Sequence, residues 1–186
     1  IYVRDLNSDT TYLAPDSGNP LDPSIDADGS HVAYVTSDAH DAVNDTNGTT
    51  LDGYVGQVGT ASFELASRLS GASTAALDAA STRTSLSDSG TIVAFETDSA
   101  QLDAGDTNGA SDVAVRTLST DPTLPNVTSI ASRASTAGGV VGNGESTHPA
   151  LAGNGLSVAY VSASTNLIGA GADTNGARDV FRKSFS

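Results

Sequence analysis

Three residue types are missing from this 186-residue sequence: cysteine, methionine and tryptophan. The absence of cysteine excludes disulfide bonds, thiolate metal sites and cysteine nucleophiles. Lysine is almost absent as well, since Lys183 is the single example. Long apolar runs are also missing, and a membrane-spanning helix needs roughly 18 or more consecutive apolar residues. We therefore expect no membrane insertion.

Basic residues are scarce. Eight Lys and Arg stand against 22 Asp and Glu, which gives a formal net charge of −14 and a pI of about 4.1. A surface of this sign repels phosphate, so we expect neither a nucleic-acid partner nor binding to an anionic membrane surface. Aspartate, Ser, Thr, Gly and Ala dominate the composition. We interpret this composition as that of an extracellular or high-salt protein. The length suits a single domain.

An internal repeat of about 61 to 67 residues organises the chain. The segments SIDADGSHVAYVTS from Ser24, SLSDSGTIVAFET from Ser85 and ALAGNGLSVAYVS from Ala150 are copies of one another. Their glycines, Gly29, Gly90 and Gly155, stand 61 and 65 residues apart. Regular self-similarity on this scale is the signature of a repeat architecture.

Each unit carries four short segments that read as β-strands. Residues 32–35, 93–96 and 158–161 combine β-branched and aromatic residues between glycine-rich turns, which favours strands and tight hairpins. Residues 63–69 alternate with a period of two, which predicts a further strand. A helix over the alanine-rich residues 61–80 is disfavoured by their Ser, Thr and Gly content and by the match of ELASRLSG, from Glu64, to the strand segment at Ile130.

The strand pattern predicts an all-β fold, a β-propeller, because four antiparallel strands per repeat describe a blade. We expect two strands at the start, two full units and three strands at the end, thirteen in all. The expected divisions are 1–23 (the end of one blade), 24–84 and 85–148 (two blades) and 149–186 (an incomplete blade). These make about three blades. A propeller closes with about four to eight blades, so we expect a larger polypeptide or a ring completed by oligomerisation.

Aromatic residues recur at two positions of the unit, and we interpret both sets as packing between blades. One set is Tyr34, Phe95 and Tyr160, and the other is Tyr2, Tyr54 and Phe181.

The candidate site is a loop with the sequence DTNG, followed by a further Asp, which occurs three times. Its oxygen-bearing side chains are Asp45, Asn47 and Asp52 in the first loop, Asp106, Asn108 and Asp112 in the second, and Asp173, Asn175 and Asp179 in the third. Hard oxygen ligands in a tight turn suit Ca²⁺. Asp and Asn also brace turns without any ion, by bonding to nearby backbone amides. The sequence leaves both alternatives open, and weak calcium binding is the cofactor prediction.

Catalytic motifs are missing. His31, His40 and His148 stand in unrelated contexts, and the sequence has no HExxH, G-x-S-x-G or phosphate-binding Gly-rich motif. We therefore predict a non-enzymatic structural or protein-binding module. The alternatives are a hydrolase of carbohydrate or peptide, with acidic or histidine side chains from several blades meeting at the axis, and a subunit of a self-assembling ring or filament.

The combined pattern resembles the TolB-like (WD-like) β-propeller repeats of bacterial proteins. It runs S-x-S/D-x-G-x-x-V-A-F/Y, then DTNG-x-x-DV, then a strand like VRDL, and it covers the chain from Ile1 to Phe185. The loop itself resembles the latter part of calcium loops in integrin-type propellers, although Val43, Ala104 and Gly171 replace the usual first acidic ligand. The resemblance implies a secreted, cell-surface or periplasmic location and a protein partner or self-association.

Overall fold

The computed structural model describes residues 1–13, 19–71, 74–119, 126–135, 139–169 and 171–185. These residues contain thirteen β-strands and one short 3₁₀ helix, η1 (Ala100–Leu102), so the predicted all-β class is confirmed. The strands are β1 (Tyr2–Asp5), β2 (Thr10–Leu13), β3 (Leu21–Ile25), β4 (His31–Thr36), β5 (Asp52–Gln57), β6 (Phe63–Leu65), β7 (Ser81–Leu86), β8 (Ile92–Thr97), β9 (Asp112–Thr117), β10 (Val127–Ile130), β11 (Ser146–Leu151), β12 (Ser157–Ser162) and β13 (Asp179–Ser184). In these residues no helix is long and apolar enough to cross a bilayer.

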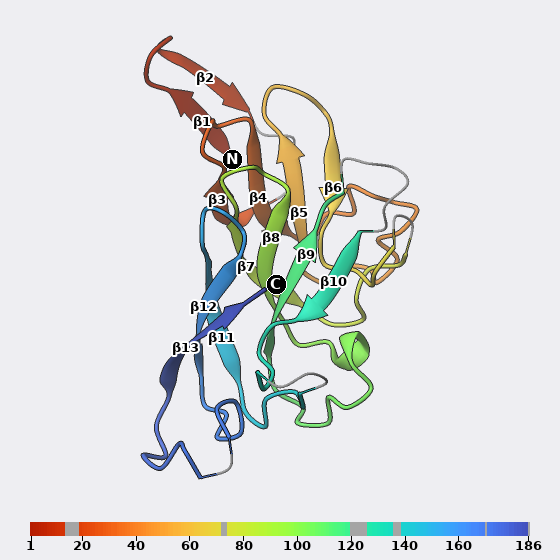
Figure 1. Ribbon diagram of the computed structural model, residues 1–186. Helices are drawn as coiled ribbons and strands as arrows, with labels where there is room; N and C mark the ends of the chain where they lie inside the picture. Colours follow the sequence, from red (N-terminus) through yellow and green to blue (C-terminus); the bar gives the residue numbers. More distant parts are fainter. Residues whose placement is uncertain (14–18, 72–73, 120–125, 136–138, 170, 186) are drawn as a thin grey trace.

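The strands form four antiparallel sheets, each a simple meander, arranged side by side (Figure 1). The sheets are β1–β2, β3–β4–β5–β6, β7–β8–β9–β10 and β11–β12–β13. This is the predicted sequence of two, four, four and three strands. The expected divisions at residues 24, 85 and 149 fall inside β3, β7 and β11, because the repeat becomes recognisable only in the second half of each of these strands.

Glycine sets the turn that opens each repeat. Gly29, Gly90 and Gly155 have φ values of 75°, 69° and 71°, a region that only glycine enters freely. Each donates its backbone N–H to the carbonyl three residues earlier, at 3.4, 3.0 and 2.8 Å. The turns join β3 to β4, β7 to β8 and β11 to β12, as the sequence predicted.

The recurring Val-Ala-Tyr/Phe segment explains how the sheets pack. Successive side chains of a strand point to opposite faces. In β8, Val93 therefore packs with Ala33 and Val55 of the preceding sheet. Ala94 packs on the other face, with Val158 and Tyr160 of the following sheet. The small alanine leaves room for the neighbouring sheet, so the core consists of layers between sheets.

The recurring aromatic residues are buried or half-buried, with one exception. Tyr34, Tyr54, Phe95 and Tyr160 are all at most 3% exposed, and Phe181 is half-buried against Tyr160, with ring centroids 6.1 Å apart. Tyr2, by contrast, is 75% exposed. Its neighbour Val3 packs toward the next sheet, so Tyr2 points the opposite way, where the described chain has no further sheet. The predicted packing role of Tyr2 is thus not seen here.

The fourth strand of each full sheet is shorter than the sequence predicted. β6 ends at Leu65, whereas the alternating pattern ran to residue 69. The chain turns back because Ala66 and Ser67 both donate their backbone N–H to the carbonyl of Gly53, at 2.7 and 3.2 Å. Ala131 and Ser132 do the same with Val113. The Ala-Ser-Arg repeat is therefore a structural turn at the end of a strand.

The first strands of the sheets, β3, β7 and β11, lie next to one another and are called the inner strands below. Leu86 of β7 donates its N–H to Ser24 Oγ of β3 at 2.9 Å, and Leu151 of β11 donates to Ser85 Oγ of β7 at the same distance. Adjacent turns are joined as well, through Ala27 N–H to the Asp88 carbonyl and Asp88 N–H to the Gly153 carbonyl. Equivalent hydrogen bonds therefore join β3 to β7 and β7 to β11.

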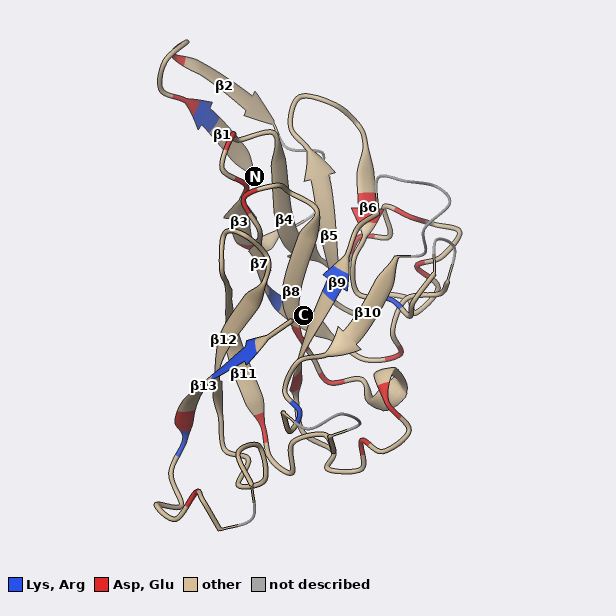
Figure 2. Cartoon of the chain, viewed as in Figure 1, with Lys and Arg blue, Asp and Glu red and all other residues tan. Residues whose placement is uncertain are grey.

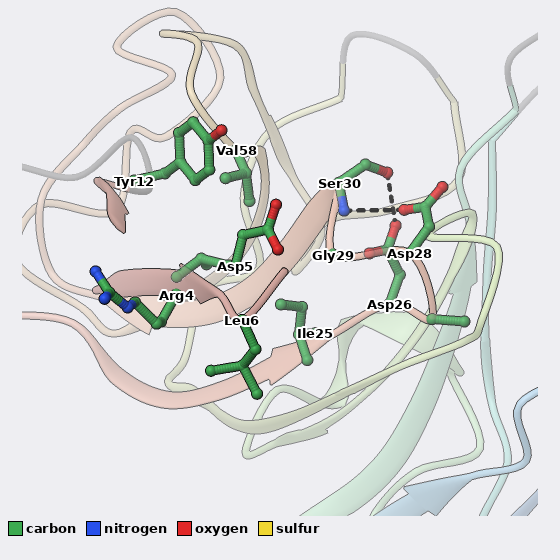
Figure 3. Close-up of a pocket in the computed structure, with 12 residues that line it drawn as sticks. Arg4, Asp5, Leu6, Tyr12, Ile25, Asp26, Asp28, Gly29, Ser30 and Val58 are labelled. Atoms are coloured by element: carbon green, nitrogen blue, oxygen red, sulfur yellow. Dashed lines mark hydrogen bonds between the residues drawn. The ribbon is translucent and has the colours of Figure 1, made fainter. Parts of the chain in front are cut away.

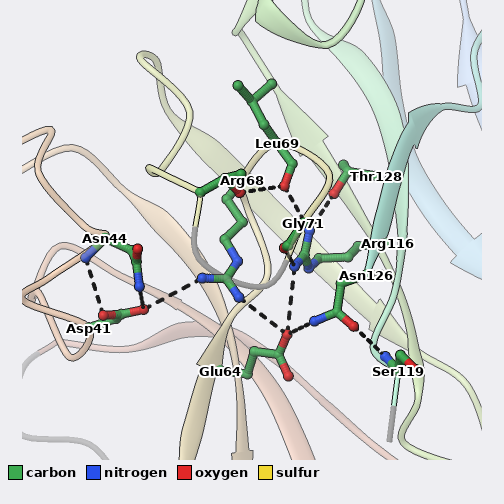
Figure 4. A network of polar contacts seen from close by, with 11 residues as sticks. Asp41, Asn44, Glu64, Arg68, Leu69, Gly71, Arg116, Ser119, Asn126 and Thr128 are labelled. Atoms are coloured by element: carbon green, nitrogen blue, oxygen red, sulfur yellow. Dashed lines mark hydrogen bonds and ion pairs between the residues drawn. The ribbon is translucent and has the colours of Figure 1, made fainter. Parts of the chain in front are cut away.

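A buried polar network joins the two four-stranded sheets at their outer edge (Figure 4). Arg116 on β9 is fully buried and donates to the carbonyls of Leu69 and Gly71, at 3.1 and 2.9 Å, and to Thr128 Oγ1 at 2.7 Å. Glu64 Oε1 lies 3.7 Å from Arg116. Burial, together with the charge of Arg68, lowers the pKa of Arg116 to about 10, so it stays protonated at neutral pH.

Candidate functional site

The first DTNG loop packs its polar side chains against the end of its own sheet. Asn47 Nδ2 donates to Asp52 Oδ2 and to the Leu77 carbonyl, both at 2.8 Å. Ser67 Oγ donates to Asp52 Oδ1 at 2.5 Å. Tyr54 Oη donates to Asp45 Oδ2 at 2.5 Å. Asp45 Oδ1 and Asn47 Oδ1 are buried without a hydrogen-bond partner.

The second loop keeps two of these contacts with other segments and differs in the bonds around its aspartates. Ser132 Oγ donates to Asp112 Oδ1 at 2.5 Å, and Asn108 Nδ2 donates to the Gly142 carbonyl at 2.6 Å. Ala114 occupies the position of Tyr54, so Asp106 lacks the equivalent hydroxyl donor. Asp112 Oδ2 is buried and has no hydrogen-bond partner. In both loops, therefore, the asparagine ties the loop to the segment that leads into the next sheet.

The third loop shares the asparagine-to-aspartate contact of the first loop and lies open. Asn175 Nδ2 lies 3.1 Å from both oxygens of Asp179, and Ala177 donates its N–H to Asn175 Oδ1 at 2.8 Å. Asp173 and Asp179 are half-buried and Asn175 is exposed. Within the described chain, no serine packs over Asp179 as Ser67 and Ser132 pack over their aspartates.

The second aspartates of the two buried loops hold protons more tightly than usual. Burial, then the charge of Asp106, raises the pKa of Asp112 to about 7. Burial, then the charge of Asp45, raises the pKa of Asp52 to about 6, although bonds from Ser67 and Asn47 oppose this. Both values stand above the ordinary value of 3.8, because an ionised carboxylate is poorly solvated here.

The raised pKa of Asp112 predicts that the free energy of unfolding, measured in the presence of chelator, depends on pH. Between pH 4 and 7 the folded state binds a proton at Asp112 that the unfolded chain has lost, so stability should fall as the pH rises through this window. We expect Asp112→Asn to flatten this fall and to raise the melting temperature at pH 8. Asp179→Asn, at the equivalent half-buried position of the open loop, should leave the wild-type profile unchanged. Identical melting profiles for Asp112→Asn and wild type would contradict this prediction.

The inner strands carry a second set of equivalent residues, which sequence reasoning missed. Asp22, Arg83 and His148 have φ values of 49°, 51° and 57° and stand 61 and 65 residues apart, the spacing of the turn glycines. Each lies at a register shift between its inner strand and the next strand of the sheet. A β-bulge of this kind redirects a side chain, and a non-glycine residue in this region costs of order 1 kcal/mol or more.

The three bulges meet at one place. Asp22, Arg83 and His148, each with the residue that follows it, line a pocket of about 240 Å³. Glu96 contacts two of the three bulges. Its Oε2 accepts from the His148 backbone N–H at 3.1 Å and lies 3.3 Å from Arg83 Nε. All three bulge residues are exposed. The inner-strand face therefore presents an acid, a base and an imidazole side by side.

The largest cavity, about 610 Å³, lies between hairpin β1–β2 and the turn after β3 (Figure 3). Tyr12 and Val58 line one side of it, and Asp28 and Ser30 line another. Grooves of about 320 and 280 Å³ occupy the equivalent positions between the following pairs of sheets. Because all three are lined by equivalent turns and strands, we attribute this cavity to the way the sheets pack.

A serine, a histidine and an aspartate also meet beside this cavity. Ser30 Oγ lies 2.8 Å and Asp26 Oδ2 lies 2.9 Å from the same nitrogen, His31 Nδ1. A catalytic relay needs the aspartate on one ring nitrogen and the serine on the other. The arrangement therefore braces the turn, and Ser30 Oγ also contacts Asp26 Oδ2 at 3.0 Å.

The other histidines lie apart from His31. His40 packs in an aromatic cluster with Tyr54 and Phe63, at centroid distances of 5.3 and 5.1 Å. Among the residues placed by the structure, no three His, Cys, Asp or Glu side chains cluster closely enough to hold a metal ion by themselves. Acidic side chains are spread over loops and strand ends (Figure 2).

Comparison with known proteins gives one informative result. No family model and no curated protein match the chain. Among solved structures, the chain is similar to the crystal structure of TolB from Acinetobacter baumannii, with a TM-score of 0.50 and 15% sequence identity. The match covers 98% of this chain and 34% of the TolB chain. At this identity the likeness concerns the fold alone, and the chain spans about a third of the length of that structure.

Proposed function

We propose that this chain is part of a non-enzymatic β-propeller of the TolB type that binds a protein or peptide through its inner-strand face. The fold likeness supports the propeller, and so do the equivalent bonds that join β3 to β7 and β7 to β11. On this proposal the thirteen strands are about three blades of a larger or oligomer-completed ring. The proposed location is periplasmic or extracellular.

The observation that carries the binding face is the backbone at Asp22, Arg83 and His148. Three unrelated side chains occupy the same strained position on three adjacent inner strands. Glycine would adopt this backbone conformation at lower free-energy cost. The presence of three larger side chains therefore indicates that the side chains have a role of their own. Ion pairing does not account for these side chains, because Arg83 is about half exposed in its contact with Glu96 and exposed ion pairs contribute at most about 1 kcal/mol.

The chemistry of the face suits a peptide. Arg83 can bind a carboxylate, Asp22 can accept from an ammonium or amide group, and His148 offers a ring nitrogen near neutral pH. The pocket is shallow and mixed in charge, which fits a short polar segment of a protein better than an apolar small molecule.

The test replaces the three side chains by glycine, which keeps the bulge conformation. A random peptide library displayed on phage is selected on the immobilised wild-type chain. We expect the Asp22→Gly, Arg83→Gly, His148→Gly variant to bind the selected peptides at least tenfold more weakly and to melt no lower than wild type. Asp9→Gly is the matched control, because Asp9 also has a positive φ, of 57°, on the β1–β2 turn away from this face.

Two outcomes would overturn the proposal. Undiminished peptide binding by the triple variant would place recognition elsewhere. A much lower melting temperature of the triple variant would mean that the three side chains serve stability, and their strained position would then need no ligand to explain it.

A further inference from the structure

We propose that the first and second DTNG loops each bind one divalent cation of the Ca²⁺ type through the buried loop oxygens that have no hydrogen-bond partner, and that the third loop, which lies open in this chain, does not. This inference concerns the DTNG loops and uses none of the side chains assigned above to the inner-strand face. It goes beyond the proposed binding face and stands or falls without it.

The first observation is the unpartnered oxygen of the second loop. Asp112 is fully buried, and its Oδ2 has no hydrogen-bond donor. The neighbouring acid is Asp106, which is 9% exposed. An ionised carboxylate only accepts hydrogen bonds, so two neighbouring carboxylates in a buried site need a positive charge to compensate theirs. Either a proton or a cation meets that need.

The first loop repeats the observation with different donors. Asp45 is 7% exposed, and its Oδ1 has no partner, nor has Asn47 Oδ1. The remaining oxygens are engaged, because Tyr54 holds Asp45 Oδ2 while Ser67 and Asn47 hold both oxygens of Asp52. The loop thus leaves a carboxylate oxygen and an amide oxygen free, the ligand types that Ca²⁺ prefers.

The third loop shows what the same sequence does without burial. Asn175 donates to both oxygens of Asp179, and Asp173 lies partly in solvent. Water can solvate these carboxylates, so no buried charge demands compensation. The DTNG sequence alone therefore does not define the proposed site. The site also needs the serine of the Ala-Ser-Arg turn, Ser67 or Ser132, packed over the second aspartate.

Two carboxylates per site predict weak binding. Calcium takes six to eight oxygen ligands, so backbone carbonyls and water must complete the coordination here. Affinity in the millimolar range suits a protein outside the cytoplasm, where calcium reaches such levels.

The experiment measures melting temperature in chelator and in millimolar CaCl₂. We expect calcium to raise the wild-type melting temperature by roughly 3 °C or more, because a ligand that binds only the folded state stabilises it. The Asp45→Asn, Asp112→Asn variant should lose this shift. It should still fold, since asparagine retains an oxygen that can accept the existing bonds. The matched control is Asp173→Asn, Asp179→Asn in the third loop, which should keep the full wild-type shift.

A second readout places the ion. Tb³⁺ bound at the first loop should give tyrosine-sensitised luminescence, because Tyr54 Oη contacts Asp45 directly. Tyr54→Phe should reduce this luminescence and leave the calcium-dependent melting shift in place. The proposal is overturned if calcium does not raise the wild-type melting temperature, if the shift survives in Asp45→Asn, Asp112→Asn, or if the control variant loses it.

Discussion

Replacing Arg116 by alanine should lower the free energy of unfolding by about 3 kcal/mol. The guanidinium is fully buried and donates hydrogen bonds to the carbonyls of Leu69 and Gly71 and to Thr128 Oγ1. Its removal takes the guanidinium donor from the Gly71 carbonyl and from Thr128 Oγ1, while the Leu69 carbonyl still accepts from Thr74 Oγ1 at 2.6 Å. Each hydrogen bond to a charged group contributes about 1.5–3 kcal/mol. Glu64 is less affected, because Arg68 and Asn126 still contact it, at 3.6 and 2.5 Å (Figure 4).

The repeat offers a matched control for Arg116. Lys183 occupies the equivalent position on β13 and donates to the equivalent carbonyl, that of Ala134, at 3.3 Å. It is less buried than Arg116, so Lys183→Ala should cost under about 1 kcal/mol. Arg116→Lys should fall between the two alanine variants, because one ammonium cannot reach both carbonyls and the threonine. Urea denaturation of the three variants measures this order, and equal effects of Arg116→Ala and Lys183→Ala would contradict it.

The second large effect is expected where alanine separates two sheets. Ala94 is fully buried and faces Val158 and Tyr160 of the next sheet. Ala94→Leu introduces three heavy atoms into this contact, and overpacking of a close-packed core costs about 1–3 kcal/mol. We expect the melting temperature to fall by several degrees for a chain of this size.

Ala159 is the control for Ala94, since it holds the same position in the last sheet. It lies half-buried, because the face of β12 that it occupies has no neighbouring sheet in the described chain. Ala159→Leu should therefore change the free energy of unfolding by no more than about 0.5 kcal/mol. If Ala159→Leu is as destabilising as Ala94→Leu in the 186-residue chain, the two positions do not differ in packing as described.

The sequence by itself determined the local architecture, because local geometry depends on local chemistry. Gly29, Gly90 and Gly155 mark tight turns since only glycine takes their backbone conformation freely. The Val-Ala-Tyr/Phe alternation predicts a strand that is buried on both faces, with the small alanine side chain facing one of the two neighbouring sheets. These signals recur three times, so the order of two, four, four and three strands could be read directly from the chain.

The candidate sites were decided by tertiary contacts. The three loops share the sequence DTNG, yet two are buried and one is open. A serine that follows the fourth strand packs over Asp52 and over Asp112, and among the described residues none packs over Asp179. The inner-strand bulges carry Asp, Arg and His, which share no sequence signal. The order of strands along the chain follows from patterns of a few residues. Burial of a charged side chain depends instead on which distant segment covers it, and this contact exists only in the folded chain.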